Sequence, residues 1–570
     1  MHSRLSTLIT IGGLLAASAL QAAPIPDAGS MLREQQPQRP LPKELPESKE
    51  KKAEAEKSGD TKRIIVKEFA FSGYEGLATE KQLQSIVADA AGKSISFDEL
   101  QALAEKITSY LRSRNWLLAK AYLPKQDVSS GLVTFVIIKG KSDGSLSIER
   151  DNSVRIRNST LFRFSENALH PGEPINEKLL ERSILLINDL PGLTAKASLE
   201  PGSSTGSTAV EMSVLEGPLF SGVLWGDNQG NRYSGSLRSN VMLVVNDPLH
   251  FGDQMLGIFT ASDRLIQGRF GLNLPLGHRG MRGDFFYTGM HYKLGKDLAP
   301  LNFTGGSNIF DAGLLYPLLR TRKNSISSTL TCSYKTLTDA QADKKLHDKV
   351  DRSVTLGFTG EHYDKMLGGG NTNWNFGATN GRLHEASDVS ISDAAANKTE
   401  GKFSRFNLGC ARLQHLTERF SLNLSWSMQY ALNNLDSSEK FYLGGPNGVR
   451  SYPIGEGSGD EGHLFNADIR YSTPVPAFCG TLTLNGFFDA GRITLNKERY
   501  PGDVSTATNR NDYWLKGAGA GFSYVYCQKY TFRGTWAHTI GRNSGRSTLG
   551  MDSDGRSANN RFWLQTMMYF

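Results

Sequence analysis

The last ten residues of the chain, "RFWLQTMMYF" (Arg561–Phe570), decide the fold class. Side chains of a β-strand point to opposite faces in turn. One face of a strand here carries the alternate residues Phe562, Leu564, Thr566, Met568 and Phe570. An alternating apolar face that ends on an aromatic residue is typical of the closing strand of an outer-membrane β-barrel. We therefore predict that Phe562, Leu564, Met568 and Phe570 form the signal that directs barrel assembly.

Similar segments of about ten residues precede this strand throughout residues 218–570. "RGDFFYTGMHY" and "SLNLSWSMQYA" are examples, and we count sixteen such segments. The connections alternate between short turns such as "LGHRG" and long polar stretches such as "LTDAQADKKLHDKV" (Leu337–Val350). Short turns at one end and long loops at the other are typical of outer-membrane barrels. The sequence thus predicts an all-β, 16-stranded antiparallel transmembrane β-barrel over residues 218–570.

The region before the barrel repeats one order of elements: strand, helix, helix, strand, strand. In the first copy, residues 63–140, "TEKQLQSIVADAAG" and "SFDELQALAEKITSYLRSRN" have the apolar spacing of amphipathic helices. Ser96 and Glu99 have the spacing of a capping box at the start of the second helix. In the second copy, residues 141–217, we expect helices at "SENAL" (Ser165–Leu169) and "NEKLLERSILLINDLPG". A tandem repeat predicts two α+β domains of one type.

The N-terminus has the layout of a secretory signal. His2 and Arg4 precede an apolar run, Leu8–Leu20, and small residues follow, so we expect residues 1–23 to be a cleaved signal peptide. The run is shorter than the roughly 20 apolar residues that span a bilayer as a helix. Within residues 24–62 we expect a short helix, Ala28–Gln36, which Pro37 ends, and then a polar linker.

Charge and motifs argue against several classes of function. The net charge of +7 is spread along the chain without a basic block, so we expect no nucleic-acid partner. The sequence has no P-loop, and we therefore expect no nucleotide partner. It also has no G-x-S-x-G, no H-E-x-x-H and no His and Cys cluster with metal-ligand spacing. We predict that the protein is not an enzyme and uses no cofactor or metal.

A glycine-rich stretch, "FYLGGPNGVRSYPIGEGSGDEG" (Phe441–Gly462), carries Arg450 between the apolar residues Val449 and Tyr452. Glycine permits close backbone approaches, so this stretch is either a flexible tip or a tightly folded hairpin in a confined space. The strand count places the stretch between the eleventh and twelfth strands, at the end of the barrel that has the long loops.

Together, these features resemble the transporters of two-partner secretion, which belong to the Omp85 superfamily. The resemblance covers residues 64–570 and rests on the repeated units, the barrel and four local matches. These matches are "LPGLTAKASLEPGSSTGSTAVEMSV" (Leu190–Val214), "DNQGNRYSG" (Asp227–Gly235), "VRSY" (Val449–Tyr452) and "FFDAG" (Phe487–Gly491). The resemblance implies that the repeats are periplasmic POTRA domains and that the barrel lies in the outer membrane of a Gram-negative bacterium.

The same resemblance implies the partners. The barrel would export one large exoprotein, of the haemolysin, adhesin or contact-dependent toxin type, which the POTRA domains bind unfolded. Outer-membrane lipid and the barrel-assembly machinery are the other expected partners. The helix at Ala28–Gln36 weakly resembles the family's plug helix, although Pro37 and Pro40 limit its length.

The resemblance also assigns the glycine-rich stretch. In this family, residues 441–462 would fold into the lumen, and Arg450 would pair with Asp489 of the motif formed by Phe487, Asp489 and Gly491. Alternation agrees, because Leu482 and Leu484 share the lipid face and Asp489 then points inward. Ser451 stands where the family has glycine, and a positive φ there would add roughly 1 kcal/mol of strain.

Two other functions stay open from the sequence alone. A barrel-assembly factor of the same superfamily normally carries more POTRA units or a different number of them. A passive porin would have the barrel without the repeats.

The four cysteines fit no metal-ligand spacing. Cys479 and Cys527 fall in short turns of the barrel, whereas Cys332 and Cys410 fall inside distant strands. The turns bring the first two close enough to consider a disulfide, provided that their Cα atoms lie within about 7 Å. We therefore name Cys479 and Cys527 as a candidate disulfide.

Overall fold

The computed structural model describes residues 25–35, 63–151, 153–203, 207–386, 397–500, 503–504 and 506–570. The expected signal peptide, residues 1–23, and the expected linker after the first helix lie outside these ranges. Within them, no helix has the length and apolar character that crossing a membrane requires. The first helix is α2 (Ala28–Gln35), which ends before Pro37 at the residue preceding the predicted end.

The first α+β unit forms a small domain over one apolar core. Its elements are β1 (Arg63–Ile65), β2 (Glu68–Ser72), α3 (Glu80–Val87), η1 (Ala88–Ala90), β3 (Ser94–Ser96), α4 (Phe97–Ser113), β4 (Lys120–Tyr122) and β5 (Leu132–Ile138). The main sheet has the order β2-β5-β4, with β2 and β5 parallel. Helix α4 packs Ile107 and Leu111 against Phe135 in the core. The capping box of Ser96 and Glu99 is confirmed, because each side chain accepts from the other's backbone N–H.

The second unit has the same order of elements. It contains β6 (Lys141–Arg150), α5 (Asn158–Ser165), η2 (Glu166–Ala168), α6 (Glu177–Asn188), β7 (Leu193–Pro201) and β8 (Ser207–Glu216), with sheet order β6-β8-β7. The helix predicted at Ser165–Leu169 corresponds to the last residue of α5 and to η2, and the prediction missed the two preceding turns of α5. The α-helix lies earlier because Leu161 and Phe164, one turn apart, are the residues that face the core.

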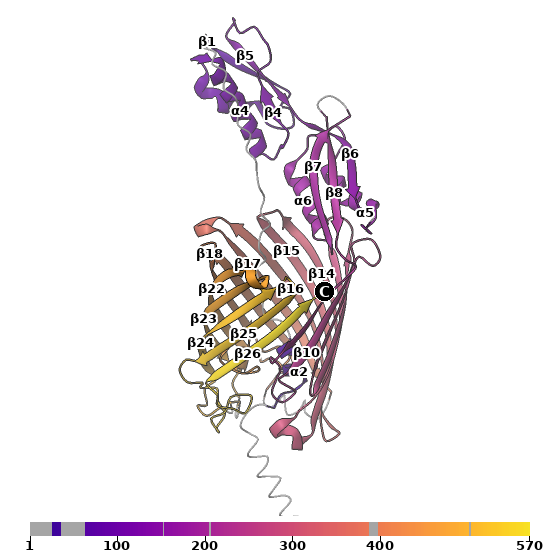
Figure 1. Cartoon of the computed structure of the whole chain (residues 1–570), viewed down its shortest axis with the longest axis vertical. Coiled ribbons are helices and arrows are strands. Elements are labelled where there is room, and N and C mark those ends of the chain that lie inside the picture. Colours follow the sequence, from indigo (N-terminus) through magenta and orange to yellow (C-terminus); the bar gives the residue numbers. More distant parts are fainter. Residues whose placement is uncertain are drawn as a thin grey trace, which may run out of the picture.

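The remaining strands close into one antiparallel barrel of sixteen strands, which confirms the predicted count. They are β9 (Phe220–Asp227), β10 (Arg238–Asn246), β11 (Gln254–Ser262), β12 (Leu265–Pro275), β13 (Arg282–Lys293), β14 (Phe303–Arg320), β15 (Asn324–Gln341) and β16 (Lys344–Asp364), followed by β17 (Gly370–Glu385), β18 (Gly401–His415), β19 (Phe420–Ala431), β22 (Glu461–Val475), β23 (Gly480–Thr494), β24 (Asp512–Tyr526), β25 (Tyr530–Thr539) and β26 (Asn560–Tyr569). Short 3-10 turns lie at η3 (Lys296–Leu301), η4 (Met366–Gly368) and η5 (Pro476–Phe478). Figure 1 shows the barrel with the two small units at one end.

The barrel closes where β26 pairs with β9, from Gln565 opposite Asp227 to Tyr569 opposite Val223. At this seam the N–H of Gly222 donates to the carbonyl of Phe570 (2.9 Å), and the N–H of Phe570 donates back (3.1 Å). The outer face of β26 carries the predicted assembly residues: Phe562, Leu564 and Phe570 are exposed, and Met568 is half-buried. Their role in assembly stays a prediction.

One predicted loop is a hairpin instead. Residues 337–350 continue β15 and β16 and turn only at Ala342 and Asp343, which both have positive φ. Polar residues can extend a strand beyond the bilayer without a desolvation cost, so a polar sequence does not mark the strand's end there. The prediction of a long loop at this place was therefore wrong.

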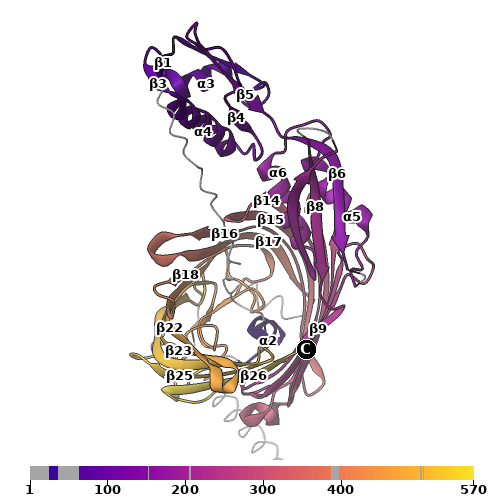
Figure 2. The same cartoon turned by 45° about the horizontal axis from the view of Figure 1, so that its top comes forward.

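The second α+β unit is fixed to the barrel by charged contacts. Asp189, which follows α6, accepts two hydrogen bonds from Arg320 at the end of β14 (2.7 and 2.8 Å). Arg182 of α6 donates to the carbonyl of Pro317 (2.8 Å), and Arg155 donates to the carbonyl of Asn246 at the end of β10 (3.4 Å). These contacts hold the unit beside the short-turn end of the barrel (Figure 2).

Candidate functional site

Two elements occupy the barrel lumen: helix α2 and the connection between β19 and β22, residues 432–460, which we call the inward loop. Figure 2 shows α2 inside the ring of strands. The inward loop includes a short hairpin of β20 (Phe441–Tyr442) and β21 (Ser458–Gly459). This arrangement places the glycine-rich stretch in a confined space.

Helix α2 packs on the inner wall through an apolar face. Met31 and Leu32 are buried in a cluster with Tyr292 of β13, Ile309 of β14 and Leu337 of β15. The N–H of Ala28 donates to Asp339 (2.9 Å), which satisfies one of the free donors at the helix N-terminus. An eight-residue helix is not stable alone in water, so these contacts are what hold it in helical form.

The polar face of α2 contacts the inward loop and β10. Ser437 donates to Asp27 (2.6 Å), and Arg33 donates to the carbonyl of Lys440 (3.1 Å). The helix approaches the loop so closely at Gly29 that only glycine fits, because a Cβ there would lie 2.3 Å from Oγ of Ser437. Helix and loop therefore form one packed unit inside the lumen.

Glu34 is the titratable group at the centre of this unit. Its carboxylate accepts two hydrogen bonds from Asn231 (3.1 Å each), and burial raises its pKa to about 8. The hydrogen bond from Asn231 and the charge of Arg238 act in the opposite direction, and Asp27 adds to the rise. Docking of α2 thus favours the protonated form of Glu34 over a range that includes neutral pH.

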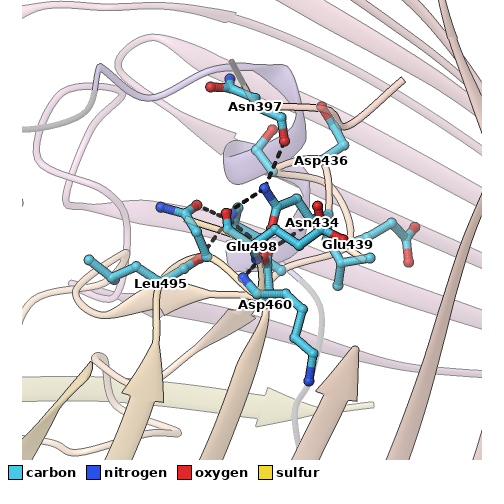
Figure 3. A network of polar contacts seen from close by, with 12 residues as sticks. Asn397, Asn434, Asp436, Glu439, Asp460, Leu495 and Glu498 are labelled. Carbon is cyan, nitrogen blue, oxygen red and sulfur yellow. Dashed lines mark hydrogen bonds and ion pairs between the residues drawn. The ribbon is translucent and has the colours of Figure 1, made fainter. Parts of the chain in front are cut away.

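The base of the inward loop is tied to the neighbouring long loops (Figure 3). Asn434 donates to the carbonyls of Asn397 (2.8 Å) and Glu498 (3.0 Å) and accepts from the N–H of Glu498 (2.7 Å). Asp460, which is fully buried, accepts from the N–H of Leu435 (3.1 Å) and from Nζ of Lys440 (2.7 Å). The loop is anchored at both ends before it enters the lumen.

Ion pairs to β15, β16 and β18 hold the first part of the loop. Glu439 pairs with Arg405 of β18 (2.6 Å) and with Lys335 of β15, and Asp436 pairs with Lys349 of β16 (2.6 Å). Both carboxylates are buried. Buried charges must be compensated, so the loop's acidic residues and the wall's basic residues depend on each other.

Arg450 lies at the tip of the loop between two carboxylates. Its guanidinium forms an ion pair with Asp489 of β23 (2.8 Å) and one with Asp468 of β22 (2.8 Å). Its backbone N–H also donates to Asp489 (3.0 Å), and its carbonyl accepts from the indole of Trp563 in β26 (2.8 Å). The side chain is only 12% exposed, and Asp489 is fully buried. One residue thus connects the loop to three strands of the wall.

The other residues of the two predicted motifs also meet here. The guanidinium carbon of Arg450 lies 3.4 Å from the centre of the Phe487 ring, an arrangement that favours a cation. A Cβ on Gly491 would lie 2.5 Å from Leu443 of the loop, so glycine is required for this packing. Val449 and Tyr452 are buried in an apolar cluster with Leu443 and Leu515. The structure therefore brings together all seven residues named for the latch.

Ser451 causes no backbone strain, because its φ is not positive. The side chain is fully buried against β24, where Gly517 leaves room for it. A Cβ on Gly517 would lie 2.1 Å from Oγ and 2.8 Å from Cβ of Ser451. The serine at this position is thus accommodated by a glycine on the facing strand.

Replacing Gly517 by valine is therefore expected to displace the loop tip. Overpacking of this kind costs about 1 to 3 kcal/mol, and here the displaced residue adjoins Arg450. We expect greater protease cleavage of the loop in the purified variant. Gly486→Val is the matched control, since a Cβ there meets only Ile469 at 3.8 Å. Ser451→Gly combined with Gly517→Ala should restore the native cleavage; equal cleavage in Gly517→Val and the control would contradict this packing.

Three residues of this site were missed from the sequence. Asp468 forms the second ion pair of Arg450, beside Asp489. Asn466 donates to the carbonyl of Gly448 (3.0 Å) and to Asp489 (2.5 Å). Trp563 donates to the Arg450 carbonyl. The sequence pattern that could have identified Asn466 and Asp468 is the strand alternation of β22, which places both side chains on the lumen face. Trp563 had the same signal, since its neighbours Phe562 and Leu564 face outward.

The cysteines are placed as expected, but they are not bridged. Cys479 and Cys527 lie in adjacent turns, and the N–H of Cys527 donates to the carbonyl of Cys479 (2.8 Å). All four cysteines are free in the structure. The disulfide stays a prediction that labelling of the unreduced protein would test, because only two thiols would then react.

Several known proteins and family models are similar in sequence to this chain. A family model described as haemolysin secretion/activation protein ShlB/FhaC/HecB matches residues 206–524, and the ShlB-type POTRA domain model matches residues 64–140. The heme/hemopexin transporter protein HuxB of Haemophilus influenzae (strain 86-028NP) is 27% identical over 100% of this chain and 99% of its own length. The outer membrane transporter CdiB of Dickeya dadantii (strain 3937) is 22% identical over 78% of each chain.

Solved structures support the same fold. CdiB from Escherichia coli is similar with a TM-score of 0.73 at 19% identity, over 91% of this chain and 93% of that one. BamA from Haemophilus ducreyi lacking POTRA domains 1–3 is similar with a TM-score of 0.50 at 13% identity, over 89% of this chain and 100% of that one. At these identities the likeness concerns the fold alone.

Proposed function

Because the chain belongs to the haemolysin secretion/activation family ShlB/FhaC/HecB, we propose that it recognises one exoprotein in the periplasm and secretes it unfolded through its barrel. The barrel lies in the outer membrane, and the N-terminal POTRA region lies in the periplasm, as in this family. The single observation that carries the proposal is the family match over residues 206–524, which include most of the barrel.

The POTRA region supplies the binding step. In the first unit, β2 and β4 are the sheet edges, and in the second unit β6 and β7 are the edges. An unpaired edge strand binds an extended chain through main-chain hydrogen bonds, which tolerate many side chains. An unfolded exoprotein is such a ligand. We propose that residues 141–217 form a second POTRA domain, because they repeat the order of elements of the first.

The exoprotein would pass through the barrel lumen, which α2 and the inward loop occupy. Helix α2 and the inward loop fill the interior together, so an extended chain passes only when both shift. Arg450 is the latch of the loop in this proposal, since its two carboxylate partners lie on the wall. No step requires a cofactor, a nucleotide or catalysis, and folding of the exoprotein outside the cell opposes its return.

The relatives suggest the kind of exoprotein. The heme/hemopexin transporter protein aligns over the whole of this chain, whereas CdiB of Dickeya dadantii aligns over 78% of it. We therefore propose an exoprotein that takes part in heme or hemopexin acquisition, ahead of a contact-dependent toxin. Co-expression with each kind of exoprotein would test this choice.

Deletion of residues 63–217 tests the function itself. A secretion transporter that lacks its POTRA region should lose export of one exoprotein while other outer-membrane barrels keep their normal levels. A barrel-assembly factor would instead show a general loss of outer-membrane barrels. Quantitative proteomics of the outer membrane and the culture medium distinguishes these outcomes, and undiminished export of the exoprotein would contradict the proposal.

A further inference from the structure

Three cations stand side by side on the outside of the barrel. Arg352 of β16 lies opposite Arg382 of β17, and Arg382 lies opposite Lys402 of β18. All three side chains are exposed, whereas their neighbours Asp351, Leu383 and Phe403 are buried toward the lumen. Strand alternation thus places the three on the outer face, and we call them the basic row. Figure 2 shows β16, β17 and β18 following one another along one wall.

The basic row has no internal compensation. Directly opposite residues on adjacent strands have Cβ atoms about 4.5 to 5.5 Å apart, and like charges in that position repel each other. Within the described parts of the chain, none of the three forms an ion pair or a side-chain hydrogen bond. Arg352 lies over the ring of Tyr334 (5.5 Å), and the nearby His384 uses the carboxylate of Glu400 (3.1 Å). Three adjacent cations that lack a partner among the described residues fit an anionic ligand.

The basic row adjoins the apolar surface of the barrel. On β16, Val354 and Leu356 follow Arg352 on the same face and are 46% and 48% exposed. On β17 and β18, Phe376 and Phe406 stack on each other (6.4 Å). Exposed apolar side chains on the outer face of a membrane barrel contact lipid tails, and the polar residues beyond them lie at the headgroup level. The row therefore stands at the level of lipid phosphates near the long-loop end.

An open apolar groove of about 1000 Å³ leads away from the row along the same outer wall. One end is lined by Arg352, Val354 and Asn380. Its walls include the outward side chains of Phe270, Phe285 and Phe310, and its floor includes the small residues Gly257 and Ala312. The outer surface is thus hollowed beside the cations, in a shape that suits an acyl chain.

We propose that this surface binds a phosphorylated, acylated lipid of the outer leaflet, with its phosphate on Arg352, Arg382 and Lys402 and an acyl chain in the groove. Two guanidinium groups and one ammonium group match the charge and the oxygen geometry of a phosphate. The site lies outside the lumen, so its existence is independent of the secretion function.

The test uses the purified full chain in detergent, with lipid A as the probe and native mass spectrometry as the measurement. The variant Arg352→Gln/Arg382→Gln/Lys402→Gln is expected to bind lipid A at least about tenfold more weakly than wild type. Lys293→Gln/Lys365→Gln/Arg492→Gln is the matched control, because these exposed cations lie on β13, in the turn after β16 and on β23, which are not paired with one another. Equal binding by the two triple variants would overturn the proposal.

Further binding measurements identify which part of the lipid each part of the site contacts. Lipid A without its phosphates should bind wild type and the basic-row variant equally, since the row acts on the phosphate. Cys332→Trp, which fills the groove from an outward position, should weaken binding of lipid A. If inorganic phosphate alone competes with lipid A at equal concentration, the row is a simple anion site and the groove has no role. Heat-modified gel mobility establishes that each variant is folded.

Discussion

Arg450→Met is expected to reduce secretion of the exoprotein by at least about tenfold while the barrel stays folded in the membrane. Methionine keeps much of the side-chain volume but removes the charge that Asp489 and Asp468 share. Removing one member of a buried ion pair costs about 3 to 5 kcal/mol, because the remaining charge is left unpaired. Every 1.4 kcal/mol changes the equilibrium between the docked and the released loop tip by a factor of ten. The tip would therefore leave its position against β22 and β23.

Two control variants separate the effect of losing the Arg450 ion pairs from the effect of removing any positive charge. Arg492→Met removes a cation from the same strand region, but its partner Asp512 is exposed, so secretion should hardly change. Arg450→Met/Asp489→Asn/Asp468→Asn should recover the stability of the barrel without recovering secretion. Exoprotein in the culture medium and heat-modified gel mobility are the two measurements. Native secretion by Arg450→Met would remove Arg450 from the mechanism.

Deletion of Ala28–Gln35 is expected to open the barrel. Helix α2 fills the lumen beside β13 to β15 and contacts the inward loop, so its loss leaves a water-filled path. We expect the single-channel conductance in planar bilayers to rise by at least about twofold, as wide barrels leave aqueous channels when nothing plugs them. Met31→Ser/Leu32→Ser, which removes the apolar face alone, should raise the open fraction without shortening the chain.

The pH dependence of conductance gives a second measure of the same helix. Docked Glu34 has a pKa of about 8, above its ordinary value of 4.5, so the docked helix binds more protons than the released one. Docking is therefore fully favoured below the ordinary pKa and weakens as pH rises toward and through about 8. Wild-type conductance should increase as the pH rises from about 4.5 to about 8 and then level off, and Glu34→Gln should flatten this change. A closed channel at all pH values in the deletion variant would refute the plug.

Much of the fold was predictable because β-strands have a short and regular period. The two-residue alternation located sixteen strands, and the alternation of short and long connections located the glycine-rich stretch between the eleventh and twelfth. The same alternation oriented Asp489 inward. These features depend on local sequence, which is why they were accessible before the structure.

The parts that were missed depend on contacts between distant residues. Strand alternation indicates that Asp468 and Trp563 face the lumen. It does not indicate at which level along the barrel axis the loop tip contacts them. Most of α5 was not predicted because eight residues carry only about two turns of periodicity. The room that Gly517 leaves for Ser451 joins two strands and a loop, so no local pattern reports it.

Cross-linking of a stalled exoprotein inside the lumen tests the central claim most directly. In a chain whose four native cysteines are replaced, single cysteines are placed at Thr483, which faces the lumen, and at its neighbour Leu484, which is 46% exposed on the outer face. The exoprotein carries cysteines along its chain and a tightly folded C-terminal domain that halts export. Secretion through this barrel predicts a disulfide to position 483 and none to position 484. The absence of any cross-link at 483, or equal cross-linking at both positions, would contradict passage of the exoprotein through the lumen.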